Sequence, residues 1–200
     1  MQPKPLEGLD GLACPNLRHE GPADRKVRRA FSIPWPGEAT RRYFAAVKLS
    51  TLLPASQIRV PLTARTKTEA IDELLAAVPF ESDTQRRAAR DAAIAREAEI
   101  STGIGRGVAI PHGRTAAVSG HHCAFGVAAS PIDWDAIDGT PCRILFLCVS
   151  PEHDAAGHIR VLSQVARVLN NSKTRQAIET ARTADDIRRV FLDDEEREGL

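Results

Sequence analysis

The sequence predicts an α/β fold in which helices sandwich a mixed, five-stranded sheet. Segments with helical apolar spacing alternate along the chain with short apolar segments typical of strands. The strongest strand candidate, residues 143–149, directly follows the turn signal Asp138-Gly139. Of the 200 residues, 42% are hydrophobic, which is enough for a single core. We therefore expect one domain over residues 46–192, between an N-terminal extension and an acidic tail at 193–200.

Residues 1–45 show little periodic apolar pattern. They contain six prolines and scattered charges, including the basic cluster at 25–29. Such a composition predicts a disordered or loosely docked extension. A docking segment for an acidic partner is the functional alternative, but a solvated tail is the simpler interpretation.

The first elements of the domain follow this extension. Three leucines before Pro54 predict a helical turn, and residues 57–62 are expected to form a strand. The next helix should begin at Thr66, because Thr66 and Glu69 have the spacing of a capping box. Its apolar residues at i, i+3, i+4 and i+7 form one stripe that must be buried. These residues are Ile71, Leu74, Leu75 and Val78.

An alanine-rich segment predicts a second helix, beginning at Asp83 or Thr84 and ending near Glu97. Arg96 then lies near the C-terminal end of this helix, where the helix dipole favours a cation. Residues 123–129 are small and apolar enough to form a buried strand.

Two helices are expected after the 143–149 strand. The first carries His158, which shares the apolar stripe with Leu162 at i+4. The last helix begins with a capping box formed by Thr183 and Asp186. The acidic residues 193–198 are expected to be frayed and solvated.

The most informative stretch is 101–113, Ser-Thr-Gly-Ile-Gly-Arg-Gly-Val-Ala-Ile-Pro-His-Gly. Its three alternating glycines allow backbone conformations that a β-carbon forbids. Pro111 disfavours a helical conformation at Ile110 and so keeps the preceding residues extended. Gly113 is expected to let the backbone turn closely past the ring of His112. We therefore expect His112 at the end of a strand, held in place and approachable.

A neutral imidazole with one nitrogen tied down is a nucleophile, a base or a metal ligand. A metal site needs three or four convergent ligands, and no Cys-x-x-Cys or His-Glu-x-x-His pattern surrounds His112. A zinc site at 121–123 would be crowded, because adjacent strand residues point to opposite faces. A dinucleotide-type phosphate loop is disfavoured, because Gly107 leads into a strand rather than a helix. No metal and no cofactor is expected, and no Ser elbow supports a hydrolase.

The 101–113 stretch resembles the active-site segment of fructose/mannitol-type enzyme IIA domains of the bacterial sugar phosphotransferase system. It is most similar to the nitrogen-related regulatory members, and the resemblance runs from Val47 to Leu192. This resemblance implies an α/β sandwich with the phosphorylated histidine in a shallow surface depression. It also implies that His112 accepts a phosphoryl group, as tele-phosphohistidine, from the phosphohistidine of HPr or a related carrier.

Two further residues match the family pattern: Arg96 upstream of the glycines, and His158 at the start of a helix. A phosphoryl group carries nearly two negative charges, and a guanidinium offers a planar fork that fits its oxygens. His158 would lie beside the positive end of a helix dipole. We expect it to donate to the phosphoryl oxygens rather than to be phosphorylated. The structural alternatives are a solvated helix face for Arg96 and an ordinary helix start for His158. No function is assigned to His19, His121, His122 and His153.

Several outputs follow from the resemblance. A regulatory, nitrogen-type role suits a chain that shows no attached IIB or membrane domain. The alternatives are a transport role, with phosphate passed to a IIB cysteine for fructose- or mannitol-like sugars, and a non-catalytic regulatory module on the same fold.

Charge and cysteine content narrow the possible partners and the compartment. The formal net charge of +1 gives no reason to expect nucleic acid or membrane binding, so proteins are the expected partners. No signal peptide or membrane span is apparent. The four cysteines show no disulfide or metal spacing, which favours reduced thiols in a cytoplasmic protein.

Overall fold

The computed structural model describes residues 47–200, so the extension expected over 1–45 lies outside it. The strands form one mixed sheet in the order β1-β5-β6-β3-β2, and β4 also pairs with β6. The β1–β5, β3–β6 and β4–β6 pairs are parallel, whereas β5–β6 and β2–β3 are antiparallel. In chain order the elements are α3 (Leu49–Leu52), the 3₁₀ turn η1 (Ala55–Gln57), β1 (Ile58–Leu62), α4 (Lys67–Leu75), α5 (Asp83–Glu99), β2 (Gly103–Gly105), β3 (Val108–Ala109), β4 (His112–Thr115), β5 (His122–Ile132), β6 (Cys142–Pro151), α6 (Ala155–Asn170), α7 (Ser172–Thr180) and α8 (Ala184–Glu198).

The expected α/β sandwich is confirmed, with six strands in the described sheet where five were expected. The difference arises at Pro111, which separates β3 from β4. Both short strands lie along β6 in the same register, with Val108 opposite Ile144 and His112 opposite Cys148. Proline has no N–H to donate to a ladder, although its carbonyl still accepts from the Cys148 N–H at 3.0 Å.

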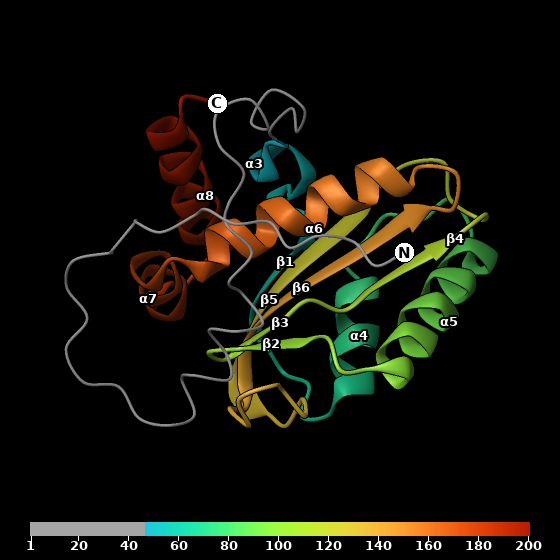
Figure 1. The fold of residues 1–200 in the computed structure, drawn as a ribbon, viewed down its shortest axis with the longest axis horizontal. Coiled ribbons are helices and arrows are strands. Elements are labelled where there is room, and N and C mark those ends of the chain that lie inside the picture. Colours follow the sequence, from blue (N-terminus) through green and yellow to red (C-terminus); the bar gives the residue numbers. More distant parts are fainter. Residues whose placement is uncertain (1–46) are drawn as a thin grey trace, which may run out of the picture. The chain divides into compact units, whose positions relative to one another are not determined.

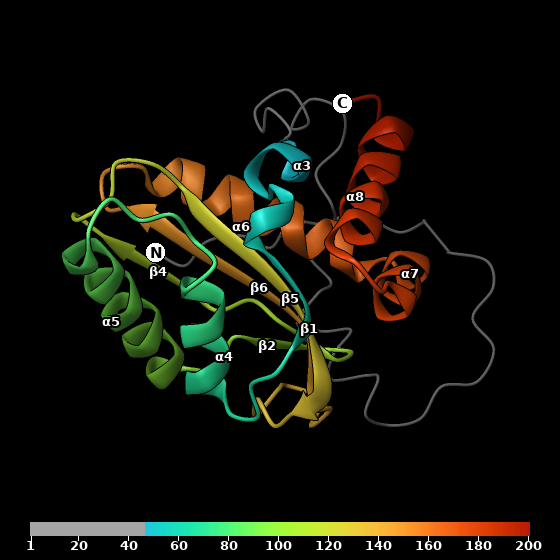
Figure 2. The same ribbon diagram turned by 180° about the vertical axis from the view of Figure 1, so that it is seen from behind.

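Helices cover both faces of the sheet and create two apolar cores (Figures 1 and 2). On one face α4 and α5 pack around Trp134, which is fully buried. On the other face α3, α6, α7 and α8 pack around Phe125 and Phe146, which are fully buried as well. The central strands are apolar on both sides for this reason.

The helix starts agree with the capping signals of the sequence. Thr66 with Glu69 and Thr183 with Asp186 both form complete capping boxes, which satisfy backbone N–H groups at the first turns of α4 and α8. Asn171 caps α7, a helix that the sequence analysis did not predict separately.

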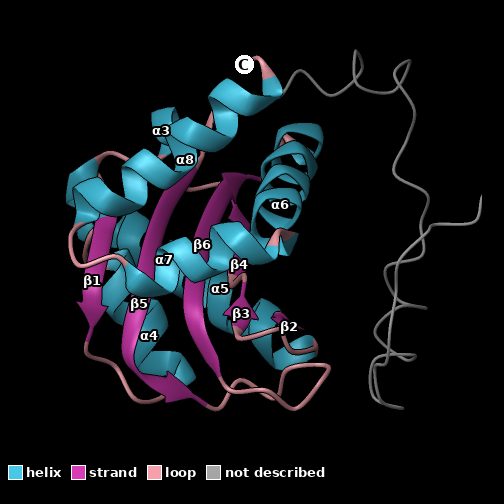
Figure 3. Cartoon of the chain, turned by 90° about the vertical axis from the view of Figure 1, so that its left-hand side faces the viewer, coloured by secondary structure: helices cyan, strands magenta, loops and turns pink. Residues whose placement is uncertain are grey.

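The acidic end of the chain is ordered, which corrects the expectation of a frayed, solvated segment. Residues 193–198 continue α8, and Asp194 and Glu195 are only 4% and 5% exposed. Asp194 pairs with Arg167 at 2.5 Å, while Glu195 accepts hydrogen bonds from the N–H and hydroxyl of Ser50 at 2.8 and 2.6 Å. The Ser50 contacts hold α8 beside α3 (Figure 3), and the Arg167 pair joins α8 to α6.

Among residues 47–200, no helix has both the length and the apolar character that crossing a membrane requires.

Candidate functional site

The candidate site lies where β4 begins and α6 begins. His112 is the first residue of β4, directly after the break at Pro111, rather than the last residue of a strand as expected. His158 is in the first turn of α6 and is buried, whereas His112 is partly exposed. The two imidazole rings are 5.4 Å apart between centroids, with 51° between their planes. The structure therefore brings together two of the three residues that the sequence singled out.

The backbone before His112 determines which ring nitrogen is free. Nδ1 of His112 lies 2.7 Å from the carbonyl oxygen of Ile110, and a carbonyl can only accept, so Nδ1 carries the hydrogen. Nε2 of the neutral ring then bears the lone pair. Burial, together with the positive charge of Arg96, lowers the pKa of His112 despite the opposing hydrogen bond to Ile110. The ring is therefore neutral, and Nε2 is nucleophilic, at pH 7.

Glycines shape the backbone on both sides of this histidine. Gly105 and Gly107 have φ values of 86° and 74°, which a β-carbon disfavours, and they close the turn between β2 and β3. Gly113 serves a different purpose from the one expected. A β-carbon there would lie 2.7 Å from the backbone of Ala92 and Ala93, so Gly113 permits close packing on α5 rather than a turn past the ring.

His158 is held from the side of β6. Its Nδ1 lies 2.9 Å from the hydroxyl of Ser150, and its Nε2 has no hydrogen-bond partner in the described part of the chain. The first turn of α6 is capped by Asp154, whose side chain accepts from the Gly157 N–H at 2.8 Å. The ring therefore lies near the positive end of the helix, as the sequence indicated.

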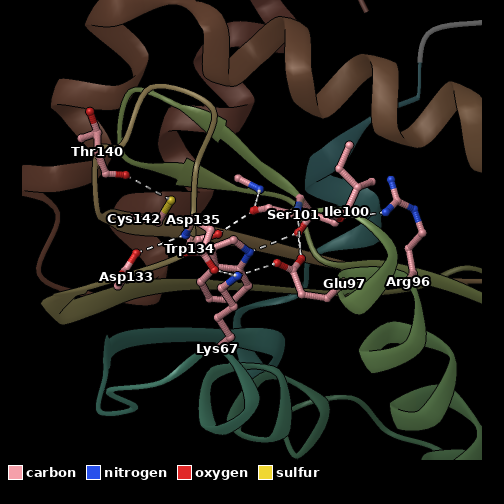
Figure 4. A network of polar contacts seen from close by, with 12 residues as sticks. Lys67, Arg96, Glu97, Ile100, Ser101, Asp133, Trp134, Asp135, Thr140 and Cys142 are labelled. Carbon is pink, nitrogen blue, oxygen red and sulfur yellow. Dashed lines mark hydrogen bonds and ion pairs between the residues drawn. The ribbon is translucent and has the colours of Figure 1, made fainter.

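Arg96 is close to the site without touching either ring. Its Nη1 donates to the carbonyl of Ile100 at 2.9 Å (Figure 4), and it forms no hydrogen bond with His112 or His158. Its charge is near enough to lower the pKa of His112. Arg96 therefore contributes electrostatically in this structure, and direct contact would require its side chain to rotate.

A buried network fixes the end of α5 that carries Arg96. Glu97 accepts hydrogen bonds from the Thr102 N–H, at 3.0 Å, and from the Thr102 hydroxyl. That hydroxyl also accepts from Nε1 of Trp134 at 3.2 Å, and Nζ of Lys67 lies 3.2 Å from the other Glu97 oxygen. Figure 4 shows the side chains of Lys67, Glu97 and Trp134 converging. The network ties the end of α5 to the start of the glycine-containing stretch.

Three polar residues behind His158 had no predicted role. The Ser150 hydroxyl lies 2.9 Å from Nδ1 of His121, and Nε2 of His121 lies 3.0 Å from the carboxylate of Asp154. Cys148 adds a contact between its sulfur and the same hydroxyl at 3.4 Å. Extending the β5–β6 register by one pair brings His121 opposite Ser150. The sequence signal was strand alternation, which places Ser150 on the same face as Cys148.

The hydrogen bonds behind His158 shift the pKa values of His121 and Asp154. The nearby Cys148 sulfur, and then the hydrogen bond to the Asp154 carboxylate, raise the pKa of His121 although burial opposes this. The Gly157 N–H, and then His121, lower the pKa of Asp154. Asp154 is therefore a carboxylate, an acceptor only, at neutral pH. Within residues 47–200, no group of three or more His, Cys, Asp and Glu side chains is arranged to hold a metal ion.

Comparison with known proteins gives consistent relatives. A PTS fructose-specific EIIA component from Haloferax volcanii is 36% identical over 143 residues, which cover 70% of this chain and 93% of the relative. A nitrogen regulatory protein from Bradyrhizobium diazoefficiens is 30% identical over 143 residues, covering 72% of this chain and 94% of the relative.

Solved structures share the fold. The nitrogen regulatory protein IIA-Ntr from Neisseria meningitidis superposes with a TM-score of 0.66 at 31% identity, covering 72% of this chain and 98% of the other. IIA mannitol from Escherichia coli superposes with a TM-score of 0.56 at 19% identity, covering 69% and 97%. The family model for the phosphoenolpyruvate-dependent sugar phosphotransferase system, EIIA 2, matches residues 51–194. The chain therefore belongs to the EIIA 2 family of this phosphoryl-relay system.

Proposed function

We propose that Nε2 of His112 accepts a phosphoryl group from the phosphohistidine of an HPr-type carrier. The observation that carries this proposal is the hydrogen bond from Nδ1 of His112 to the Ile110 carbonyl. It leaves a lone pair on Nε2 of a neutral ring that solvent can reach. The product would be the tele-phosphohistidine.

The transfer itself needs no proton and no added nucleophile. The Nε2 lone pair attacks phosphorus, a new N–P bond forms, and the N–P bond of the donor breaks in line with it. The electron pair of the broken bond returns to the donor imidazole. Because both imidazoles must approach one phosphorus atom, a partly exposed His112 suits the step better than a deeply buried one.

His158 and Arg96 are proposed to stabilise the phosphoryl oxygens. The ring of His158 is 5.4 Å from that of His112, and its Nε2 is available to a ligand. Arg96 would reach an oxygen after leaving the Ile100 carbonyl, and a guanidinium–phosphate pair is stronger than the bond it replaces.

Apolar side chains are exposed beside both of these residues. Ile159, which follows His158, is 55% exposed, and Ile100 at the end of α5 is 67% exposed. Large exposed apolar residues near a site of transfer suit a transient protein partner. We propose that they form the landing surface of the donor.

Phosphorylation in vitro tests the assignment. Incubation with phosphoenolpyruvate, enzyme I and HPr should place acid-labile, base-stable phosphate on the wild-type chain. His112→Ala should abolish incorporation, whereas His158→Ala and Arg96→Ala should slow it. The exposed His153→Gln is the control and should behave as wild type. Phosphate on the His112→Ala variant, or its loss only in the His158→Ala variant, would refute the assignment. No incorporation in any variant would favour the non-catalytic regulatory module.

We propose a regulatory output in the cytoplasm, in which phosphorylation switches binding to a protein target. The support is the likeness to IIA-Ntr, which has the higher TM-score of the two structures above, and the free buried thiols of Cys123, Cys142 and Cys148. Sugar transport is the second candidate, supported by the 36% identity to a fructose-specific component. Adding purified IIB protein to the phosphorylated chain separates the two. Rapid movement of phosphate to a IIB cysteine favours transport, and retention on His112 favours regulation.

A further inference from the structure

The hydroxyl of Ser150 is shared among three neighbours. It lies 2.9 Å from Nδ1 of His121, 2.9 Å from Nδ1 of His158, and 3.4 Å from the sulfur of Cys148. A hydroxyl has one hydrogen to donate and can accept two. The two imidazoles therefore cannot both present a lone pair to Ser150. At least one of the two Nδ1 atoms must carry a hydrogen.

The protonation state of His121 determines which of the two rings carries a hydrogen on Nδ1. The Asp154 carboxylate only accepts, so Nε2 of His121, 3.0 Å away, carries a hydrogen in every state. When His121 is neutral, its Nδ1 is a lone pair, and the Ser150 hydroxyl must donate to it. His158 must then donate to Ser150 from Nδ1. A neutral His158 in this arrangement has a lone pair on Nε2 and cannot donate to a phosphoryl oxygen.

Protonation of His121 removes the requirement that His158 donate from Nδ1. Both nitrogens of His121 now donate, Nδ1 to Ser150 and Nε2 to Asp154, which frees the Ser150 hydrogen for Nδ1 of His158, with the Cys148 sulfur at 3.4 Å as the competing acceptor. Neutral His158 then exchanges its own hydrogen with solvent, losing it from Nδ1 and gaining it on Nε2. One proton is gained in all, by His121. Nε2 of His158 becomes a donor, which is what a phosphoryl oxygen requires.

We propose that His121, Asp154 and Ser150 form a positioning relay that selects the tautomer of His158 and thereby couples its hydrogen-bond donor to the protonation of His121. The three residues need not touch the phosphoryl group themselves. The functional consequence rests on the proposed phosphorylation of His112, whereas the tautomer coupling is a property of the chain alone.

The fold around His121 favours this pairing. Gly157 leaves space for it, because a β-carbon there would lie 2.0 Å from the Asp154 carboxylate and 2.5 Å from Nε2 of His121. The titratable and charged groups that act on His121 are Cys148 on β6 and Asp154 before α6. The pKa of the neighbouring His122 is lowered by burial and by His121 and raised in part by Glu81. His158 on α6 faces it across Ser150, and Arg160 acts on Asp154.

The sign of the pH dependence follows from these neighbours. The pKa of His121 is raised above that of a free histidine, so its protonated form persists to higher pH. The donor on Nε2 of His158 is therefore present below this pKa and is lost as pH rises through it. His112 stays neutral over the same range, because its own pKa is lowered.

Two-bond ¹H–¹⁵N NMR spectra of the full-length, ¹⁵N-labelled chain test the coupling directly, with His158→Asn and His121→Asn used to assign the rings. The expected result is that His158 changes from the Nδ1–H to the Nε2–H tautomer as pH falls, at the midpoint at which His121 titrates. In Ser150→Ala this coincidence should disappear. A His158 tautomer that stays constant while His121 titrates, or that still follows it in Ser150→Ala, would overturn the proposal.

Phosphoryl acceptance from phospho-HPr supplies the second measurement. The wild-type rate should fall roughly ten- to a hundredfold as pH rises through the midpoint of the His121 titration. A rate change of this size corresponds to the free energy of one hydrogen bond to a charged group. The Ser150→Ala variant should still accept phosphate, but its rate should not show this fall with pH. The exposed-site control His153→Gln should show the same fall as wild type. An unchanged fall in Ser150→Ala would contradict the relay. Absence of phosphate on His112 would contradict the proposed function, while the NMR result would stand alone.

Discussion

Gly113→Ala should destabilise the chain through a collision between β4 and α5. The added β-carbon would lie 2.7 Å from the Ala92 carbonyl carbon and 2.7 Å from the Ala93 nitrogen. Both atoms are helix backbone, so neither can rotate away, and α5 or β4 must shift. Overpacking of this kind costs about 1–3 kcal/mol, and a backbone obstacle favours the upper part of this range.

Part of that cost is offset in the unfolded state. Replacing glycine by alanine reduces the entropy of the unfolded chain, which stabilises the fold by about 0.4–1 kcal/mol. The net loss in the free energy of unfolding is then about 2 kcal/mol. In a domain of this size, that corresponds to a fall in Tm of about 4–8 °C.

Urea unfolding followed by far-UV circular dichroism measures this difference, with Gly120→Ala as the matched control. Gly120 is exposed, and a β-carbon there would meet no atom within 4 Å. Gly120→Ala keeps the entropic gain without the collision, so it should be neutral or slightly stabilising. Equal unfolding midpoints for the two variants would refute the packing argument. Because β4 carries His112 and α5 carries Arg96, Gly113→Ala should also slow phosphoryl acceptance.

Three further predictions concern titratable side chains. Glu97→Ala should lower the free energy of unfolding by about 2–3 kcal/mol in urea melts, because the buried backbone N–H of Thr102 loses its acceptor. Glu99→Ala, at an exposed position of the same helix, is the control and should change this free energy by less than about 0.5 kcal/mol. Glu195→Ala removes two hydrogen bonds to α3 and should cost about 1–2 kcal/mol in thermal melts, with exposed Glu196→Ala as the neutral control. The pKa of His112 is lowered below its unfolded value of 6.5, so its contribution to stability is present above pH 6.5 and declines as pH falls toward the folded pKa. His112→Gln should therefore lose less stability than wild type between pH 7 and pH 5, and parallel stability profiles would contradict this assignment.

Local signals predicted the extended segment that leads to His112 and much of the fold. Proline and glycine restrict the backbone within one or two residues, so the extended segment before His112 could be inferred from the sequence. Capping boxes act over three residues, and both boxes formed as expected. These features depend on sequence neighbours, which explains why they could be recognised without a structure.

The features that the sequence did not reveal depend on long-range pairing. The contact of Ser150 with His121 spans 29 residues and exists only in the β5–β6 register. A single serine at the end of an apolar strand does not indicate which distant residue it will contact. The ordered acidic end is similar, because Glu195 reaches a partner 145 residues away. Without that partner, its charge pattern is typical of a solvated tail.

The break at Pro111 has a consequence for how this surface can diversify. β3 and β4 keep one offset against β6 on both sides of the proline, so the imidazole of His112 is anchored independently of the β2–β3 turn. Insertions or substitutions at that turn could therefore leave the position of His112 unchanged.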